Sequence, residues 1–210
     1  MPSSTGTFDL DHSLIRARKV LARTVIPNDR NLEWLYSVLK YEGMSTPAQT
    51  PIPASSRQLL RHAVATLAYR GGNAVRNSPA EFAEFRGCES GRTAAQILAH
   101  IGDLLDWAVS IAQGKQSWNI SDALSWEKET DRFFAALKRF DDFLASAEPL
   151  HVQPEKLLQA PLADALTHVG QIAMLRRMAG GPVKGENYFV ADIVIGRVGP
   201  QQTPPKRQFD

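Results

Sequence analysis

Apolar residues recur every three or four positions in four long stretches of the chain, the spacing that places them on one face of an α-helix. The stretches are residues 56–76, 92–113, 121–147 and a fourth that begins near residue 161 or somewhat earlier and runs to 179. Connections of modest length separate them, and no alternation of strands and helices occurs. The pattern predicts an all-α protein, an antiparallel four-helix bundle.

The two ends of the chain follow other patterns. Shorter helices are predicted over residues 13–24 and 30–41, ahead of a linker rich in proline, serine and threonine at 43–56. We therefore expect an N-terminal helical extension with its linker over 1–55, a four-helix body over 56–182 and a C-terminal tail over 183–210. The tail includes a β-prone run at 188–198.

Composition narrows the class of protein. The chain has 210 residues, 43% of them hydrophobic, with a net charge of +2 and a single cysteine. The length and the hydrophobic content are enough for one globular core. The small net charge gives no strong electrostatic signal for binding to nucleic acid or a membrane. No signal peptide, membrane helix or disulfide framework is recognisable, so we expect a cytoplasmic protein. The most basic segment, residues 16–23, indicates a solvated helix face, or alternatively an anion-binding surface.

The fourth predicted helix carries the most informative pair of residues. Within 160–182 it ends at Gly180-Gly181-Pro182, and it holds Asp164 and His168 four positions apart. This spacing places both side chains on one face, which also carries apolar residues such as Ile172. We therefore expect a carboxylate and an imidazole to point toward the core. A buried carboxylate is costly unless it is paired or binds a metal.

The second predicted helix places His100 on an apolar face in the same way, among residues such as Ile97 and Leu104. Apolar faces converge in a bundle, and bundle metal sites are built from side chains of facing helices. Two imidazoles and one carboxylate are a ligand set of catalytic zinc or non-haem iron sites. The alternative is that Asp164 hydrogen-bonds His168 or His100 within the core.

Other candidate residues carry weaker signals. His62 is expected at the surface, His12 and His151 lie in or beside loops, and Cys88 has no neighbour that would activate it. Gln171 lies on the same side of its helix as His168, so it could orient a metal ligand or make a purely structural hydrogen bond. The chain contains no nucleophile elbow, phosphate-binding loop, dinucleotide fingerprint or C-x-x-C motif.

Two segments resemble the DinB-like (YfiT-like) family of metal-binding four-helix bundles. TAAQILAHIGDLLDWAVSIAQG (93–114) is similar to the family's second helix, and THVGQIAMLRRMAGGP (167–182) to its fourth-helix ending. The resemblance covers residues 56–182. It implies that His100 and His168 match the first and last of three metal-binding histidines. Asp164 departs from that pattern, as does the carboxylate of relatives similar to the mycothiol-dependent maleylpyruvate isomerases.

The resemblance implies a divalent metal (zinc, nickel or iron) and a homodimer. It also implies chemistry on a small-molecule substrate, in some members with a low-molecular-weight thiol, as in the bacillithiol transferases. Our leading hypothesis is therefore a metal-dependent thiol transferase, isomerase or hydrolase that uses His100, Asp164 and His168. The alternative is a non-catalytic helical bundle with a degenerate metal site, acting as a dimeric interaction or stress-response protein. Neither hypothesis involves nucleic acid or a membrane.

Overall fold

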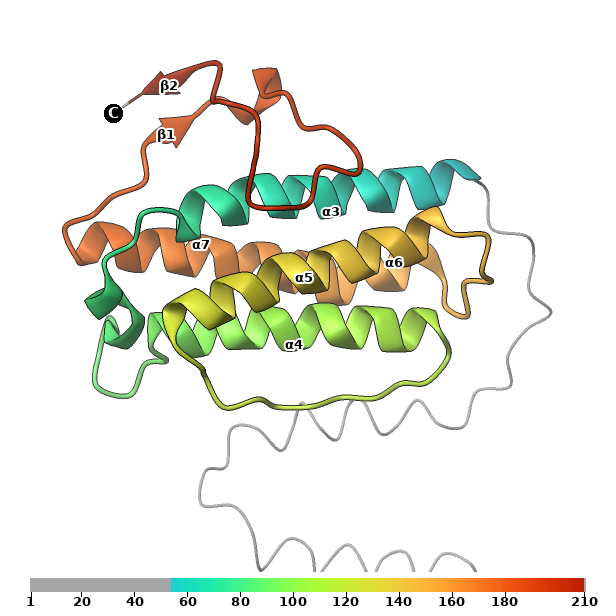
Figure 1. The fold of residues 1–210 in the computed structure, drawn as a ribbon, viewed down its shortest axis with the longest axis horizontal. Coiled ribbons are helices and arrows are strands. Elements are labelled where there is room, and N and C mark those ends of the chain that lie inside the picture. The colour runs from blue at the N-terminus through green and yellow to red at the C-terminus, as the bar shows by residue number, and fades with distance from the viewer. Residues whose placement is uncertain (1–53, 210) are drawn as a thin grey trace, which may run out of the picture. The chain divides into compact units, whose positions relative to one another are not determined.

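A computed structural model describes residues 54–209 of the chain (Figure 1). The chain divides into two units, residues 1–49 and 50–210, and the described residues belong to the second. The predicted helices 13–24 and 30–41, the basic segment 16–23, His12 and all but the end of the predicted linker lie outside the described residues. The structure therefore concerns the predicted helical body and the C-terminal tail.

The described part of the chain is mostly helical, with four long helices at the predicted places. They are α3 (Ala54–Val75), α4 (Ala94–Ala112), α5 (Trp126–Ala145) and α7 (Ala163–Met178). The largest difference in bounds is at α5, predicted to begin at residue 121. Ser121 instead binds the side chain of Asp103 through its backbone N–H and its hydroxyl, which holds 121–125 in a loop.

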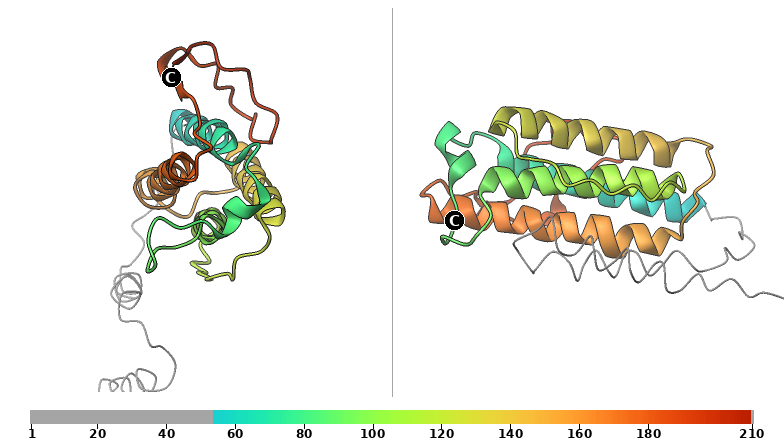
Figure 2. Two further views of the ribbon diagram at one scale, coloured as in Figure 1. Left: turned by 90° about the vertical axis from the view of Figure 1, so that its left-hand side faces the viewer. Right: turned by 90° about the horizontal axis from the view of Figure 1, so that it is seen from below.

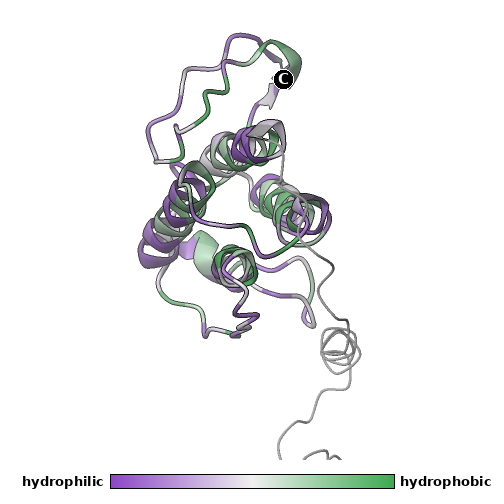
Figure 3. Ribbon diagram, turned by 90° about the vertical axis from the view of Figure 1, so that its right-hand side faces the viewer, coloured by the Kyte–Doolittle hydropathy of each residue, from purple (hydrophilic) through white to green (hydrophobic). Residues whose placement is uncertain are grey.

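Each long helix packs against two others: α4 contacts α5 and α7, and α3 contacts the same two. Seen end-on, the four surround a common centre (Figure 2). Apolar side chains from all four fill that centre, and the hydrophilic side of α5 faces outward (Figure 3). The largest fully buried side chains include Tyr69, Phe133, Phe140, Leu104 and Leu162.

A proline lies in the distorted helical turn that directly precedes α7. The one-turn helix α6 (Pro154–Leu157) is followed by a π-helical turn, Leu158–Leu162, and then by α7 without a break. Pro161 has no N–H to donate to the preceding turn, and a wider π turn accommodates such a gap in the hydrogen-bond ladder. The fourth predicted helix thus begins, as expected, somewhat before residue 161, but in a distorted form.

The C-terminal tail packs on α3 rather than forming the strand that its β-prone run suggests. Residues 188–190 form a short 3-10 turn and 191–198 form no strand. Instead β1 (Gly185–Glu186) pairs antiparallel with β2 (Gln208–Phe209). The hydroxyl of Tyr69 donates to Glu186 at 2.6 Å, and burial next to this carboxylate raises the pKa of Tyr69. A strand needs a partner edge, and 191–198 meets none among the described residues.

Two adjacent glycines in α3 offer a matched test of packing. A Cβ atom at Gly71 would lie 2.5 Å from Cζ of the buried Phe133 ring, whereas one at Gly72 would lie 3.5 Å from Phe134, an ordinary contact. We expect Gly71→Ala to destabilise the protein by about 1–3 kcal/mol through overpacking. Gly72→Ala should stabilise it by about 0.5–1 kcal/mol, because alanine favours the helix. Urea unfolding of both variants tests this, and equal effects would contradict it.

No helix among the described residues is long and apolar enough to cross a membrane.

Candidate metal centre

His100, Asp164 and His168 lie together where α4 packs against α7. Asp164 stands between the histidines: its Oδ1 lies 3.5 Å from Nε2 of His168, and its Oδ2 lies 3.9 Å from Nε2 of His100. The two imidazole rings meet edge to face, with centroids 4.7 Å apart. One ligand atom from each residue falls within 4.8 Å of the other two. The structure thus brings together all three predicted ligands, in a group that could hold a metal ion.

Local sequence fixes the backbone that carries each ligand. A capping box sets the start of α4, since Thr93 and Gln96 exchange hydrogen bonds between side chain and backbone. The cap lies about two turns before His100. On the other side, the π-helical turn at 158–162 ends directly before the turn that holds Asp164. Such turns occur frequently at functional sites.

The three side chains lie at the edge of the core, which corrects the expectation that they point into it. Ala165, Val169 and Ile172 are buried and form the core face of α7. Asp164 and His168 are each one position before a member of this stripe, so they lie on its flank. The Asp164 side chain is 45% exposed, while His100 and His168 are largely buried. The carboxylate therefore keeps access to water, and a ligand could approach from that side.

Electrostatics favour the neutral form of His100. Burial lowers the pKa of its imidazole to about 4; the positive charge of Arg92 acts in the same direction, and the carboxylates of Asp164 and Asp103 oppose it. Near pH 7 the ring is therefore uncharged. This is the form that coordinates metals, so binding at His100 requires no loss of a proton.

His168 is oriented by its neighbour one turn later. Nδ1 of His168 lies 2.8 Å from Oε1 of Gln171. The amide oxygen can only accept, so Nδ1 carries the proton and the lone pair of the neutral ring is on Nε2. Nε2 is the atom that faces Asp164. Gln171 thus makes the contact by which a neighbouring group orients a metal-binding histidine.

The donor set fits a divalent cation. Tetrahedral ligands at the usual zinc distances of about 2.0–2.1 Å lie roughly 3.3 Å from one another. The separations of Asp164 from the two histidines, 3.5 and 3.9 Å, are slightly larger than this. Both contacts are ion-pair distances longer than an ordinary hydrogen bond, so the structure does not choose between a metal site and the alternative in which Asp164 pairs with a histidine. Three protein ligands also leave coordination positions for water or substrate.

Two tryptophans extend the site beyond the predicted residues. The Trp118 ring lies edge-on to His100, with centroids 5.9 Å apart, and edge-on to Trp107 at 5.6 Å. The helical spacing of the sequence places Trp107 on the same helix face as His100, so this neighbour was predictable. Trp118 belongs to the polar loop 113–125, where periodicity gives no information; a large aromatic residue in a polar loop is the one available signal. Together these rings form an apolar wall beside the histidine.

The remaining candidates stay apart from this group. His62 and His151 are exposed, and Cys88 is exposed with Ser90 as its hydrogen-bonding neighbour at 3.8 Å. Among residues 54–209, His100, Asp164 and His168 are the one set of three metal-ligating side chains brought this close.

Comparison of the chain with protein-family models, with curated proteins and with solved structures finds no match.

Proposed function

We propose that this protein is a metal-dependent enzyme of the DinB-like class, built on an antiparallel four-helix bundle and acting on a small-molecule substrate. The observation that carries the proposal is the cluster of His100, Asp164 and His168, contributed by two packed helices. The three potential ligand atoms converge without hydrogen-bonding one another. The segments 93–114 and 167–182, which resemble the family's second helix and fourth-helix ending, supply these same residues.

In this proposal His100 and His168 donate through nitrogen and Asp164 through a carboxylate oxygen. A divalent cation held there would supply Lewis acidity, which would lower the pKa of a bound thiol or water or polarise a carbonyl. Gln171 holds His168 with Nε2 directed at the site. Trp107 and Trp118 supply an apolar wall on the His100 side. Thiol transfer, isomerisation and hydrolysis are all compatible with this arrangement.

A homodimer is part of the proposal. Met174 and Met178 on α7 are more than half exposed. Exposed apolar side chains on one helix face suit a contact between two copies. Light scattering on the purified protein measures the mass directly.

The rival proposal is a non-catalytic bundle in which Asp164 and His168 form a buried polar network that fixes helix register. Two observations weigh against it. Asp164 is nearly half exposed, and it makes no hydrogen bond to either histidine. A register-fixing network needs satisfied, buried partners, and this carboxylate has neither property.

Elemental analysis of the untagged protein tests the proposal. Wild-type protein reconstituted with zinc, nickel or ferrous iron should hold about one metal per chain, and Asp164→Ala should lose most of it. Asp131→Ala, a change at an exposed position of α5, is the matched control and should retain the metal. A wild-type protein that stays metal-free after all three reconstitutions would favour the non-catalytic bundle. If the wild type does bind metal, the metal-loaded protein would be assayed with thiol substrates.

A further inference from the structure

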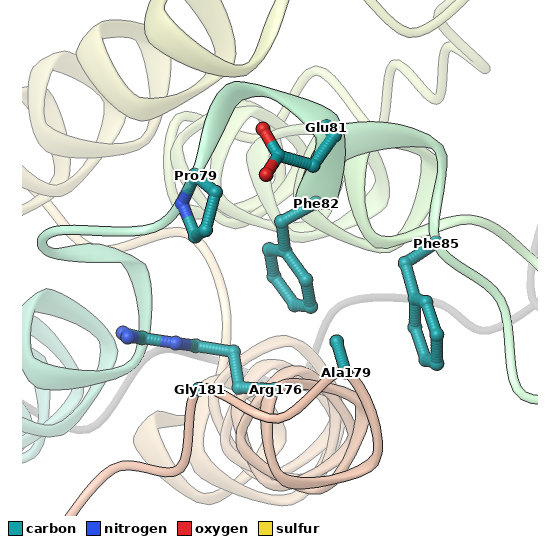
Figure 4. Close-up of a pocket in the computed structure, with 7 residues that line it drawn as sticks. All are labelled: Pro79, Glu81, Phe82, Phe85, Arg176, Ala179 and Gly181. Carbon is teal, nitrogen blue, oxygen red and sulfur yellow. The ribbon is translucent and has the colours of Figure 1, made fainter.

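A cavity lies at the C-terminal end of α7, between that helix and the 3-10 turn Ala80–Glu84 (Figure 4). Its volume is about 170 Å³. An apolar cavity of about 150 Å³ holds one benzene molecule, so this space accommodates a single small ring. Most of its lining is apolar: Pro79, Phe82, Phe85, Ala179 and Gly181. The two charged residues that line it are Arg176 and Glu81.

Arg176 is the unusual member of this cavity. Only 9% of its surface is exposed, yet no carboxylate within the described residues forms an ion pair with it. Nη1 donates to the backbone oxygens of Ala74 and Arg76, at 3.1 and 2.7 Å. Nε is buried without an acceptor, and Nη2 makes no hydrogen bond to the described chain. Burial lowers the pKa of this guanidinium.

The other arginines with buried partners are neutralised locally. Arg61 forms a two-bond pair with Asp141, and Arg132 binds Asp103 and Asp106. Arg176 instead contacts two carbonyls just at the end of α3, where partial negative charge favours a cation. Contact with these carbonyls accounts for the position of Nη1 but not for Nε and Nη2. It leaves a full positive charge at the wall of an apolar cavity, and burying an unpaired charge is costly.

We propose that this cavity binds a small organic carboxylate with an apolar body, its charge on Arg176 and its body against Phe82, Phe85 and Ala179. A planar carboxylate matches the planar guanidinium, and charge-assisted hydrogen bonds are the strong ones. The site is separate from the candidate metal centre, because Arg176 lies eight residues after His168, about 12 Å along the helix axis. The proposal does not depend on the metal.

Glu81 gives the site a second, measurable property. It is exposed and lines the same cavity, so its negative charge opposes a bound carboxylate. Glu81→Gln should therefore tighten carboxylate binding by about two- to fivefold. Glu84→Gln removes the same charge from an exposed position of the same turn that does not line the cavity. It serves as the matched control and should leave the affinity unchanged.

The test is calorimetric titration of the full-length protein with benzoate and with benzamide, its neutral counterpart of nearly the same shape. We expect benzoate to bind with a Kd of about 1 mM, a value usual for a ligand of this size, and benzamide at least about tenfold more weakly. Ala179→Leu fills the cavity while keeping Arg176, and it should abolish benzoate binding. Arg176→Gln should do the same, with circular dichroism to confirm that the variant folds.

Several results would overturn the proposal. Equal binding of benzoate and benzamide, no benzoate binding to the wild type, or unchanged binding in Ala179→Leu would each exclude a carboxylate site in this cavity. Inorganic phosphate competing as well as benzoate would exclude selection for carboxylates. Titration of His168→Ala separates the two centres: undiminished benzoate affinity supports the cavity, and lost affinity assigns benzoate to the metal centre instead.

Discussion

Replacing His168 by alanine should abolish stoichiometric metal binding and leave the helical content intact. The substitution removes one of three protein ligands, and Asp164 and His100 alone make a poor site, since zinc sites in proteins use three or four protein ligands. His168 lies on the flank of the core stripe, and its one side-chain hydrogen bond among the described residues is to Gln171. The cost to stability of the metal-free protein should therefore be small, about 1 kcal/mol.

Two readouts separate loss of the site from loss of the fold. Metal per chain should fall from about one to near zero, while the far-ultraviolet circular dichroism spectrum stays unchanged. Metal added at about 100 times its Kd should stabilise the wild type by about 2.7 kcal/mol and the variant not at all. His62→Ala is the control, because His62 is exposed on α3 and is not part of the cluster. Unchanged metal content in His168→Ala would refute the proposed site.

Helical periodicity was sufficient to predict which side chains meet. The four-residue step from Asp164 to His168 placed both on one side of α7, and the apolar face of α4 placed His100 toward the neighbouring helix. Both inferences use positions along single helices, and the packing of α4 against α7 follows from burying those faces. The resemblance to DinB-like proteins selected the same residues, and that family assignment stays a proposal.

Periodicity could not predict how deeply the cluster is buried or what surrounds it. A step of one residue turns a side chain by about 100°, so Asp164 sits beside the buried Ala165 rather than in the core. Trp118 reaches His100 from a loop whose path depends on contacts made far away in the sequence. The sequence likewise does not predict that Arg176 is buried without an ion-pair partner among residues 54–209, because its sequence neighbours carry no information about which acidic groups lie near it in space.

A buried ionic cluster holds the loop that carries Trp118. Nη2 of Arg132 donates to Asp103, and also to Asp106 at 3.1 Å, while Nη1 lies 3.7 Å from Glu129. Asp103 and Glu129 are almost completely buried. Asp103 accepts from Ser121, and Glu129 accepts from the backbone N–H of Leu124 at 2.9 Å. Arg132 is therefore the cation shared by the two carboxylates to which the end of loop 113–125 is tied.

Replacing Arg132 by methionine should destabilise the protein by about 3–5 kcal/mol, the largest loss we expect from a single substitution. The change keeps much of the side-chain volume and leaves two buried carboxylates without their cation, which costs far more than the pair itself contributes. Arg132→Lys keeps the charge but loses the planar fork, so its loss should be intermediate. Urea unfolding of the wild type, Arg132→Lys and Arg132→Met measures the free energy of unfolding, which should decrease in that order.

Arg139→Met is the matched control for this substitution. Arg139 also comes from α5 and also binds Asp106, but its side chain is 52% exposed. An exposed ion pair contributes about 0–1 kcal/mol, so this variant should unfold close to the wild type. Tryptophan fluorescence adds a second readout: loosening of loop 113–125 in Arg132→Met should change the emission of Trp118, and Arg139→Met should not. Similar losses in both methionine variants would mean that the buried cluster is not what holds the loop.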